Sequence, residues 1–180
     1  MINGILKIFN GEFLALIKNF FDLKRIRGIA DYQFSSKIGH KFFPDSVGIT
    51  YSRRTGRIRH IYLNRTLLAT LRPTNGMFSL TIAGARRIIR LIDYPKLRVI
   101  VQKEIESFIM DGRNVFAPHV IMADEEIRPG EEVIVTNNKD EVLAVGKALL
   151  TSREMLAFNR GVAVKVRRGI GEKKLRRISL

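Results

Sequence analysis

Arginines crowd around a glycine in the first third of the chain, and the chemistry available to them is phosphate binding. The residues concerned are Arg53, Arg54, Arg57 and Arg59, with Gly56 among them. A guanidinium group stays charged and can donate two parallel hydrogen bonds to one phosphate. Glycine suits the tip of a hairpin, because it accepts backbone conformations that other residues avoid. The sequence therefore predicts a basic hairpin tip that contacts phosphates, while a solvated basic loop remains the alternative.

Residues that could carry out catalysis are scarce. The chain has no cysteine, which excludes a disulfide, a thiolate nucleophile and a cysteine-bound zinc. None of the three histidines, His40, His60 and His119, has an acidic residue within a few positions to orient its imidazole. The acidic cluster at residues 124–132 surrounds a Pro-Gly pair and is expected to be an exposed turn. We therefore expect no metal site, no cofactor and no enzyme activity.

Charge is distributed unevenly along the 180 residues, whose net charge is +15. Residues 1–90 hold 16 basic and 4 acidic side chains, residues 91–159 hold 8 and 12, and residues 160–180 hold 8 and 1. Concentrated positive charge attracts phosphates, because binding releases the counterions that surround a polyanion. A polyanion is the expected partner, and a generic basic surface is the alternative that the composition leaves open.

The first thirty residues are strongly apolar, yet they do not predict a membrane span. Charged residues such as Lys7, Glu12 and Lys18 interrupt the run, whereas a span needs about 18 to 20 nearly uninterrupted apolar residues. The order of features in a signal peptide is also missing, so a cytoplasmic protein is expected. Apolar residues at spacings of three and four predict an amphipathic helix, namely Phe9, Phe13, Leu16, Phe20 and Leu23. This helix packs on the core or on a partner in one interpretation and lies on a lipid surface in the other.

The basic hairpin precedes a region with the periodicity of strands. Alternating residues over 58–63 and a second apolar run over 66–71 predict two strands joined by a short turn. Pro73 to Gly76 is a turn sequence, and residues 77–82 predict a third strand. A short helix is predicted over residues 83–92, ending ahead of a proline. The expected first module is an antiparallel meander with helices.

The charge balance reverses near residues 93–96, which indicates a domain boundary. Beyond it the sequence predicts one helix over 103–110, closed by Gly112, and a second over 152–158 with Ser152 as its N-cap. The predicted strands are short and lie at residues 98–101, 115–122, 132–136, 142–149 and 162–166, with a hairpin turn at 137–140. Short strands joined by tight turns favour a small closed barrel, because closure removes the sheet edges.

Several segments of this second half resemble a PUA domain. They are Gly112–Ala117, Asp124 with Ile127–Val133, Leu143–Ala148 and Gly161–Gly169. The likeness covers about residues 97–171 and is greatest for the PUA domain of archaeal archaeosine tRNA-guanine transglycosylases. Upstream, the segments Asp31–Phe34, Phe43-Pro44, Ser52–Arg59 and Leu71–Pro73 resemble the small α+β module that precedes the PUA domain in those proteins.

The resemblance implies an α+β protein in three parts. A basic pre-PUA-like module with an N-terminal amphipathic helix occupies residues 1–96, a PUA-type β-barrel residues 97–171, and a basic tail residues 172–180. The family's enzymes carry their chemistry in a large barrel with an aspartate nucleophile and a cysteine-bound zinc, and this chain has neither the length nor the cysteines. The expected function is non-catalytic RNA binding, with tRNA as the first choice of ligand. An accessory subunit of a transglycosylase-like catalytic chain is one form of that role, and a ribosome-associated protein that binds rRNA is the alternative.

The expected RNA site draws on both modules. Alternation along the last strand predicts that Lys165 and Arg167 share one face, while Val164 and Val166 enter the core. By resemblance, the segment 113–117 forms the neighbouring wall, with Phe116 either near the RNA or in the core. The full set comprises Arg53, Arg54, Arg57 and Arg59 of the first module and Arg113, Asn114, Phe116, Lys147, Lys165, Arg167 and Arg168 of the second.

Overall fold

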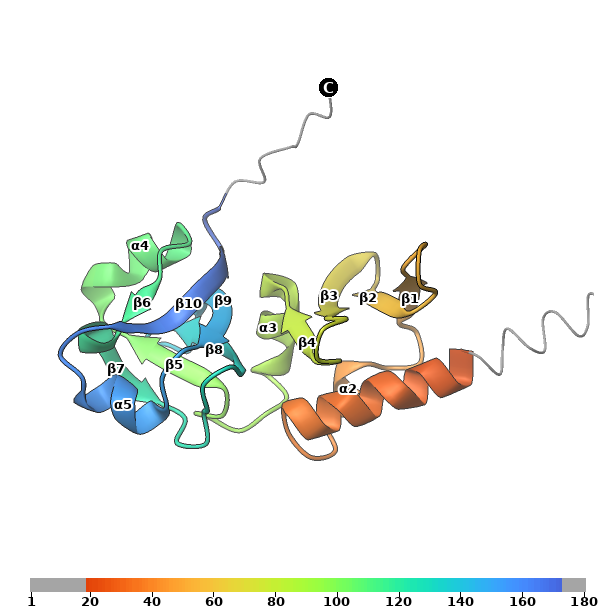
Figure 1. The fold of residues 1–180 in the computed structure, drawn as a ribbon, viewed down its shortest axis with the longest axis horizontal. Coiled ribbons are helices and arrows are strands. Elements are labelled where there is room, and N and C mark those ends of the chain that lie inside the picture. Colours follow the sequence, from red (N-terminus) through yellow and green to blue (C-terminus); the bar gives the residue numbers. More distant parts are fainter. Residues whose placement is uncertain (1–18, 173–180) are drawn as a thin grey trace, which may run out of the picture.

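The computed structural model describes residues 19–172, which form two sheets lying beside each other, with one long helix beside the first sheet and short helices elsewhere (Figure 1). The first half contains a helix over residues 19–33, α2 (Gly39–Phe42), β1 (Gly48–Tyr51), β2 (Ile58–Leu63), β3 (Thr66–Leu71), β4 (Phe78–Leu80) and α3 (Ile82–Ile88). The second half contains β5 (Arg98–Val101), a 3-10 turn (Lys103–Ile105), α4 (Glu106–Met110), β6 (Val115–Phe116), a second 3-10 turn (Ala117–His119), β7 (Val120–Ala123), β8 (Glu132–Thr136), β9 (Val142–Ala148), α5 (Ser152–Ala157) and β10 (Val162–Gly169).

The first sheet is the predicted antiparallel meander, in the order β1-β2-β3-β4. Asn64 and Arg65 take positive φ angles of 48° and 64° in the turn between β2 and β3, which gives the tight reversal that the sequence predicts. The third predicted strand is shorter than expected, because the Thr81 hydroxyl accepts a hydrogen bond from the Gly84 N–H and so begins α3. Helix α3 in turn ends at Ile88 instead of residue 92.

The core of the first module is rich in aromatic side chains. Phe34, Phe42, Phe43 and Phe78 are buried and pack ring against ring. The helix over residues 19–33 buries Ile26 and Ala30 in this core and packs Leu23 against it, whereas Phe20 of the predicted apolar face is 64% exposed. Phe9, Phe13 and Leu16 of that prediction lie outside the described residues, as does the tail beyond residue 172. No helix within residues 19–172 is long and apolar enough to cross a membrane.

The second sheet curls into a nearly closed barrel, as predicted. Its order is β6-β10-β9-β8-β5-β7, and β5 pairs with β8 in parallel while the other pairs are antiparallel. The end strands β6 and β7 are joined directly by the 3-10 turn Ala117–His119, which interrupts the single strand predicted over 115–122. Gly112 follows α4 with a φ of 89°, as its predicted capping role requires.

The N-cap of α5 is Thr151, so the prediction of Ser152 was wrong. The Thr151 hydroxyl accepts the Glu154 N–H, and the Glu154 carboxylate accepts the Thr151 N–H, which makes a complete capping box. Ser152 is buried and donates its hydroxyl to the Ala123 carbonyl at 3.1 Å. Both residue types can cap a helix, and a contact with a distant strand decides between them.

The two modules share an apolar core. Leu97, Ile134, Val142 and Val145 belong to the second module but pack within the hydrophobic cluster of the first. All five positions of β8 are buried, because one face of this strand meets the barrel interior and the other meets the first module. The two RNA-binding surfaces predicted from the sequence are therefore carried on modules that are packed together.

Candidate nucleic-acid interface

The four predicted arginines of the first module lie at or next to the tip of the β1–β2 hairpin, with Arg53, Arg54 and Arg57 in the turn and Arg59 near the start of β2. The Ser52 N–H donates to the Arg57 carbonyl and the Gly56 N–H to the Ser52 carbonyl, both at 2.8 Å, and Gly56 takes a φ of 64°. Arg53, Arg54, Arg57 and Arg59 are exposed, and within residues 19–172 none of them forms an ion pair or a side-chain hydrogen bond. Their guanidinium groups are therefore available to a ligand, and we call these four residues the hairpin tip.

The hairpin tip carries its charge on arginine alone. His60, on β2, contacts the Thr70 hydroxyl through Nδ1 at 3.1 Å. Burial, and then the nearby charge of Arg59, lowers the pKa of His60. The imidazole is therefore neutral at pH 7 and adds no positive charge to this surface.

On the barrel, the structure brings Lys147 and Lys165 together. They are directly opposite partners on β9 and β10, both exposed, and neither forms an ion pair among the described residues. Phe116 on the adjacent β6 is 48% exposed, so it faces solvent and not the core. Arg113 is also exposed, just before β6. Arg113, Phe116, Lys147 and Lys165 are called the barrel rim below.

Three other residues of the predicted site already have partners in the protein. The Asn114 side-chain oxygen accepts the Val166 N–H at 3.0 Å and so ties β10 to the start of β6. Arg168 forms an exposed ion pair with Glu172 at 2.7 Å. Arg167 donates to the Glu132 carboxylate at 3.0 Å and to the Leu80 carbonyl of β4 at 3.0 Å.

Lys165 and Arg167 are both exposed, Val164 is buried and Val166 packs against the barrel core, as the predicted alternation along β10 requires. The guanidinium of Arg167 nevertheless binds partners within the protein. The register between β9 and β10 shifts between Val166 and Arg168, and Val166 is only half-buried. At this irregularity the Arg167 side chain points toward the first module, whereas the Lys165 side chain forms no ion pair among the described residues.

The acidic cluster at residues 124–132 is the expected exposed turn at Glu125, Glu126 and Glu131, but not at its two ends. Glu132 is 2% exposed and Asp124 is buried, with its carboxylate accepting the Leu97 N–H at 2.8 Å.

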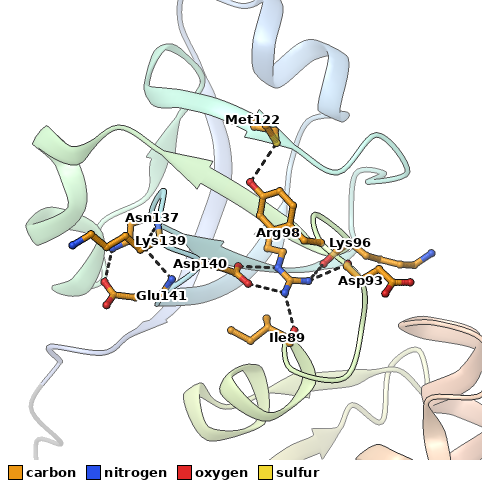
Figure 2. Close-up of polar contacts among 10 residues, drawn as sticks. Ile89, Asp93, Lys96, Arg98, Met122, Asn137, Lys139, Asp140 and Glu141 are labelled. Atoms are coloured by element: carbon orange, nitrogen blue, oxygen red, sulfur yellow. Dashed lines mark hydrogen bonds and ion pairs between the residues drawn. The ribbon is translucent and has the colours of Figure 1, made fainter.

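A buried arginine between the modules was not predicted from the sequence. Arg98 opens β5, is 1% exposed, and donates to both carboxylate oxygens of Asp140 at 2.9 Å (Figure 2). It also donates to the carbonyls of Ile89, Lys96 and Asp93 at 2.8, 2.9 and 3.3 Å. The Asn137 side-chain oxygen accepts the N–H groups of Lys139 and Glu141, which fixes the turn that carries Asp140. Arg98 thus joins the end of α3 to the β8–β9 hairpin.

Two further arginines outside the predicted site line a groove between the modules. Arg86 lies on α3 and Arg90 in the turn that follows it. Both are exposed, and the groove has a volume of about 730 Å³. Its other wall includes Met110, Leu143 and Ile170, with Glu106 and Glu141 as acidic neighbours. The helical spacing of the arginines was visible in the sequence, but their position beside the barrel depends on how the modules pack.

Family models match both halves of the chain. Residues 24–95 match the patch-forming domain C2 of tRNA-guanine transglycosylase, and residues 97–170 match the PUA domain. The chain is a tandem of a C2 domain and a PUA domain. This confirms the resemblance that the sequence motifs indicate.

Curated relatives of the tandem are named tRNA-guanine(15) transglycosylase. The protein of Methanothermobacter thermautotrophicus is 47% identical over 148 residues, which is 82% of this chain and 23% of the relative. The protein of Pyrococcus abyssi is 45% identical over 148 residues, again 82% of this chain and 25% of the relative. The chain thus spans about a quarter of the length of these relatives.

Solved structures share the same tandem arrangement. A hypothetical protein from Pyrococcus horikoshii OT3 superposes with a TM-score of 0.69 at 26% identity, over 84% of this chain and 92% of its own. A conserved PUA domain protein from Thermoplasma acidophilum has a TM-score of 0.62 at 18% identity, over 86% of this chain and 92% of its own, which shows a common fold. The PUA domain and the likeness to transglycosylases of tRNA support RNA binding by this chain.

Proposed function

We propose that this chain is a non-catalytic RNA-binding protein whose ligand is folded tRNA. The observation that carries the proposal is the match of the C2–PUA tandem to relatives whose name specifies a tRNA guanine. Two surfaces with unpaired cations support it, one on each domain. Structured RNA is recognised largely through its shape, its phosphates and its 2′-hydroxyl groups, which suits flexible cations better than a deep pocket.

The two surfaces offer different contacts. The hairpin tip presents guanidinium groups that can each grip a phosphate through two hydrogen bonds. The barrel rim combines two lysines with the exposed ring of Phe116, onto which an unpaired base can stack. A titration of the protein with folded tRNA and with unstructured RNA of equal length tests the proposal. Tighter binding of the folded tRNA is expected, and equal binding of the two would contradict it.

The lysines of the barrel rim give a direct test of the PUA surface. Changing both Lys147 and Lys165 to glutamate is expected to weaken tRNA binding about ten- to a hundredfold, because two attractive phosphate contacts become repulsive. The melting temperature should not fall, since both side chains are exposed and unpaired. Lys24→Glu with Lys41→Glu is the matched control, because these exposed lysines belong to the C2 domain. If both double variants lose affinity equally, the rim is not a specific contact.

We also propose that the protein acts beside a catalytic chain of the transglycosylase type. Phe20 and Phe21 are mostly exposed at the start of the described helix, next to an apolar segment of the sequence. Gel filtration of the two purified proteins tests this role. Co-migration is expected, with loss of the complex when both phenylalanines are changed to serine. Separate elution of the unaltered proteins would contradict an accessory role.

A further inference from the structure

The outer edge of β4 is closed by side chains and not by another strand. β4 is the last strand of the meander, so its outward N–H and C=O groups need other partners. The Gln33 amide binds both groups of Phe78, at 2.6 and 2.9 Å. At Leu80, the N–H donates to Glu132 at 2.7 Å and the C=O accepts from Arg167 at 3.0 Å. An ion pair of the PUA domain thus occupies the place of a neighbouring strand of the C2 domain.

This ion pair lies in a buried and charged environment. The guanidinium of Arg167 contacts both carboxylate oxygens of Glu132, whose side chain is almost fully buried. The pKa of Glu132 is raised, because the effect of burial exceeds the lowering by Arg167, the Leu80 N–H and the nearby charge of Arg72. The Arg72 Nε is itself buried without a hydrogen-bond partner among the described residues. Removing one partner of such a pair leaves an uncompensated charge in the interface.

The ion pair acts together with two other links between the domains. Arg98 joins the PUA domain to the end of α3, and the apolar core continues across the boundary. The β1–β2 hairpin and β6 lie toward opposite ends of the molecule (Figure 1). The hairpin tip and the barrel rim therefore lie apart on two domains that are joined by three separate links.

We propose that Glu132 and Arg167 are positioning residues that clamp β4 to the barrel and hold the two RNA-binding surfaces at one spacing. The RNA part of this inference rests on the proposed function. A ligand that reaches both surfaces gains the second contact at a high effective concentration, provided that the geometry is fixed and matches. The preferred RNA is then a rigid folded element that spans both domains. Arg167 acts through Glu132 and Leu80 and does not contact phosphate.

Glu132→Gln separates this role from a direct RNA contact. The substitution removes a negative charge, so long-range electrostatics alone would strengthen RNA binding. The clamp predicts the opposite, a loss of about tenfold or more in affinity for folded tRNA, because the two surfaces lose their fixed spacing. Glu131→Gln is the matched control, since the adjacent residue is exposed and loses the same charge. Tighter binding by Glu132→Gln would overturn the inference.

Arg167→Lys provides the second variant. Lysine retains the charge that a phosphate contact needs, but it lacks the planar fork that reaches Glu132 and Leu80 together. A similar loss of affinity is expected, whereas Arg153→Lys should change binding less than about twofold, because this exposed arginine of α5 lies outside the predicted RNA site. If Glu132→Gln unfolds the protein, Arg167→Lys decides the question. Unchanged tRNA binding by Arg167→Lys would overturn the clamp.

Measuring the domain orientation without RNA separates this inference from the proposed function. Residual dipolar couplings of the full chain should report a changed or averaged orientation of the PUA domain in Glu132→Gln and Arg167→Lys, but not in their controls. If the unaltered protein binds no RNA, the proposed function fails, and the clamp is then tested by the couplings alone. Couplings of Glu132→Gln and Arg167→Lys that are identical to those of the unaltered protein would overturn the clamp.

Discussion

Changing Arg98 to methionine is expected to lower the free energy of unfolding by about 2–4 kcal/mol, because it removes the buried cation of an ion pair whose carboxylate is 34% exposed. The change leaves the Asp140 carboxylate without its cation and the carbonyls of Ile89 and Lys96 without a donor. Buried acceptors that lose their partners cost stability beyond the lost bond itself. Urea denaturation followed by circular dichroism measures the effect.

Two further variants show whether the loss of unfolding free energy comes from the Arg98–Asp140 ion pair. Arg168→Met breaks an exposed ion pair and should cost less than about 1 kcal/mol. Changing Asp140 to leucine in the Arg98→Met background should recover part of the loss, because the uncompensated carboxylate is then gone. If the loss of unfolding free energy caused by Arg98→Met is within about 1 kcal/mol of the loss caused by Arg168→Met, Arg98 does not hold the domains together.

Changing Arg53, Arg54 and Arg57 together to glutamine is expected to flatten the salt dependence of tRNA binding by about two units of log–log slope. Each phosphate contact contributes about 0.7 to 0.9 to that slope through counterion release. The three side chains are exposed and unpaired within the described part of the chain, so the melting temperature should stay the same. Dissociation constants measured over a series of salt concentrations give the slope.

A triple variant of the same charge provides the control for the hairpin tip. Arg25, Arg65 and Arg153 are also exposed but lie on the first described helix, the opposite end of β2 and α5. Their replacement by glutamine should leave the slope nearly unchanged if contacts, and not net charge, determine it. Equal flattening by both triple variants would show that the hairpin tip has no special part in binding.

The sequence predicts features of the fold that depend on local rules. Alternation of apolar residues and turn-forming residues such as Asn64 and Gly112 identify the meander and the barrel strands. The same rules cannot choose between Thr151 and Ser152 as a cap, because the choice depends on Ala123 of another strand. The exposed arginines of the hairpin are likewise recognisable, since glycine and arginine are close together in the sequence.

The role of Arg167 could not be predicted from local patterns. Its partners Glu132 and Leu80 lie 35 and 87 residues away. The sequence cannot distinguish an arginine that is free for a ligand from one that is paired within the protein, because only tertiary packing places a buried carboxylate beside the guanidinium. Asn114 gives the same lesson, since its partner Val166 is 52 residues away.

The identity of the bound RNA tests the account most directly. The full-length protein can be crosslinked to RNA by ultraviolet light in its native cell, and the attached RNA can then be sequenced. We predict that tRNA sequences dominate and that the triple variant of the hairpin tip recovers much less of them. A predominance of ribosomal RNA, or crosslinks no more abundant than those of the triple variant, would contradict the account.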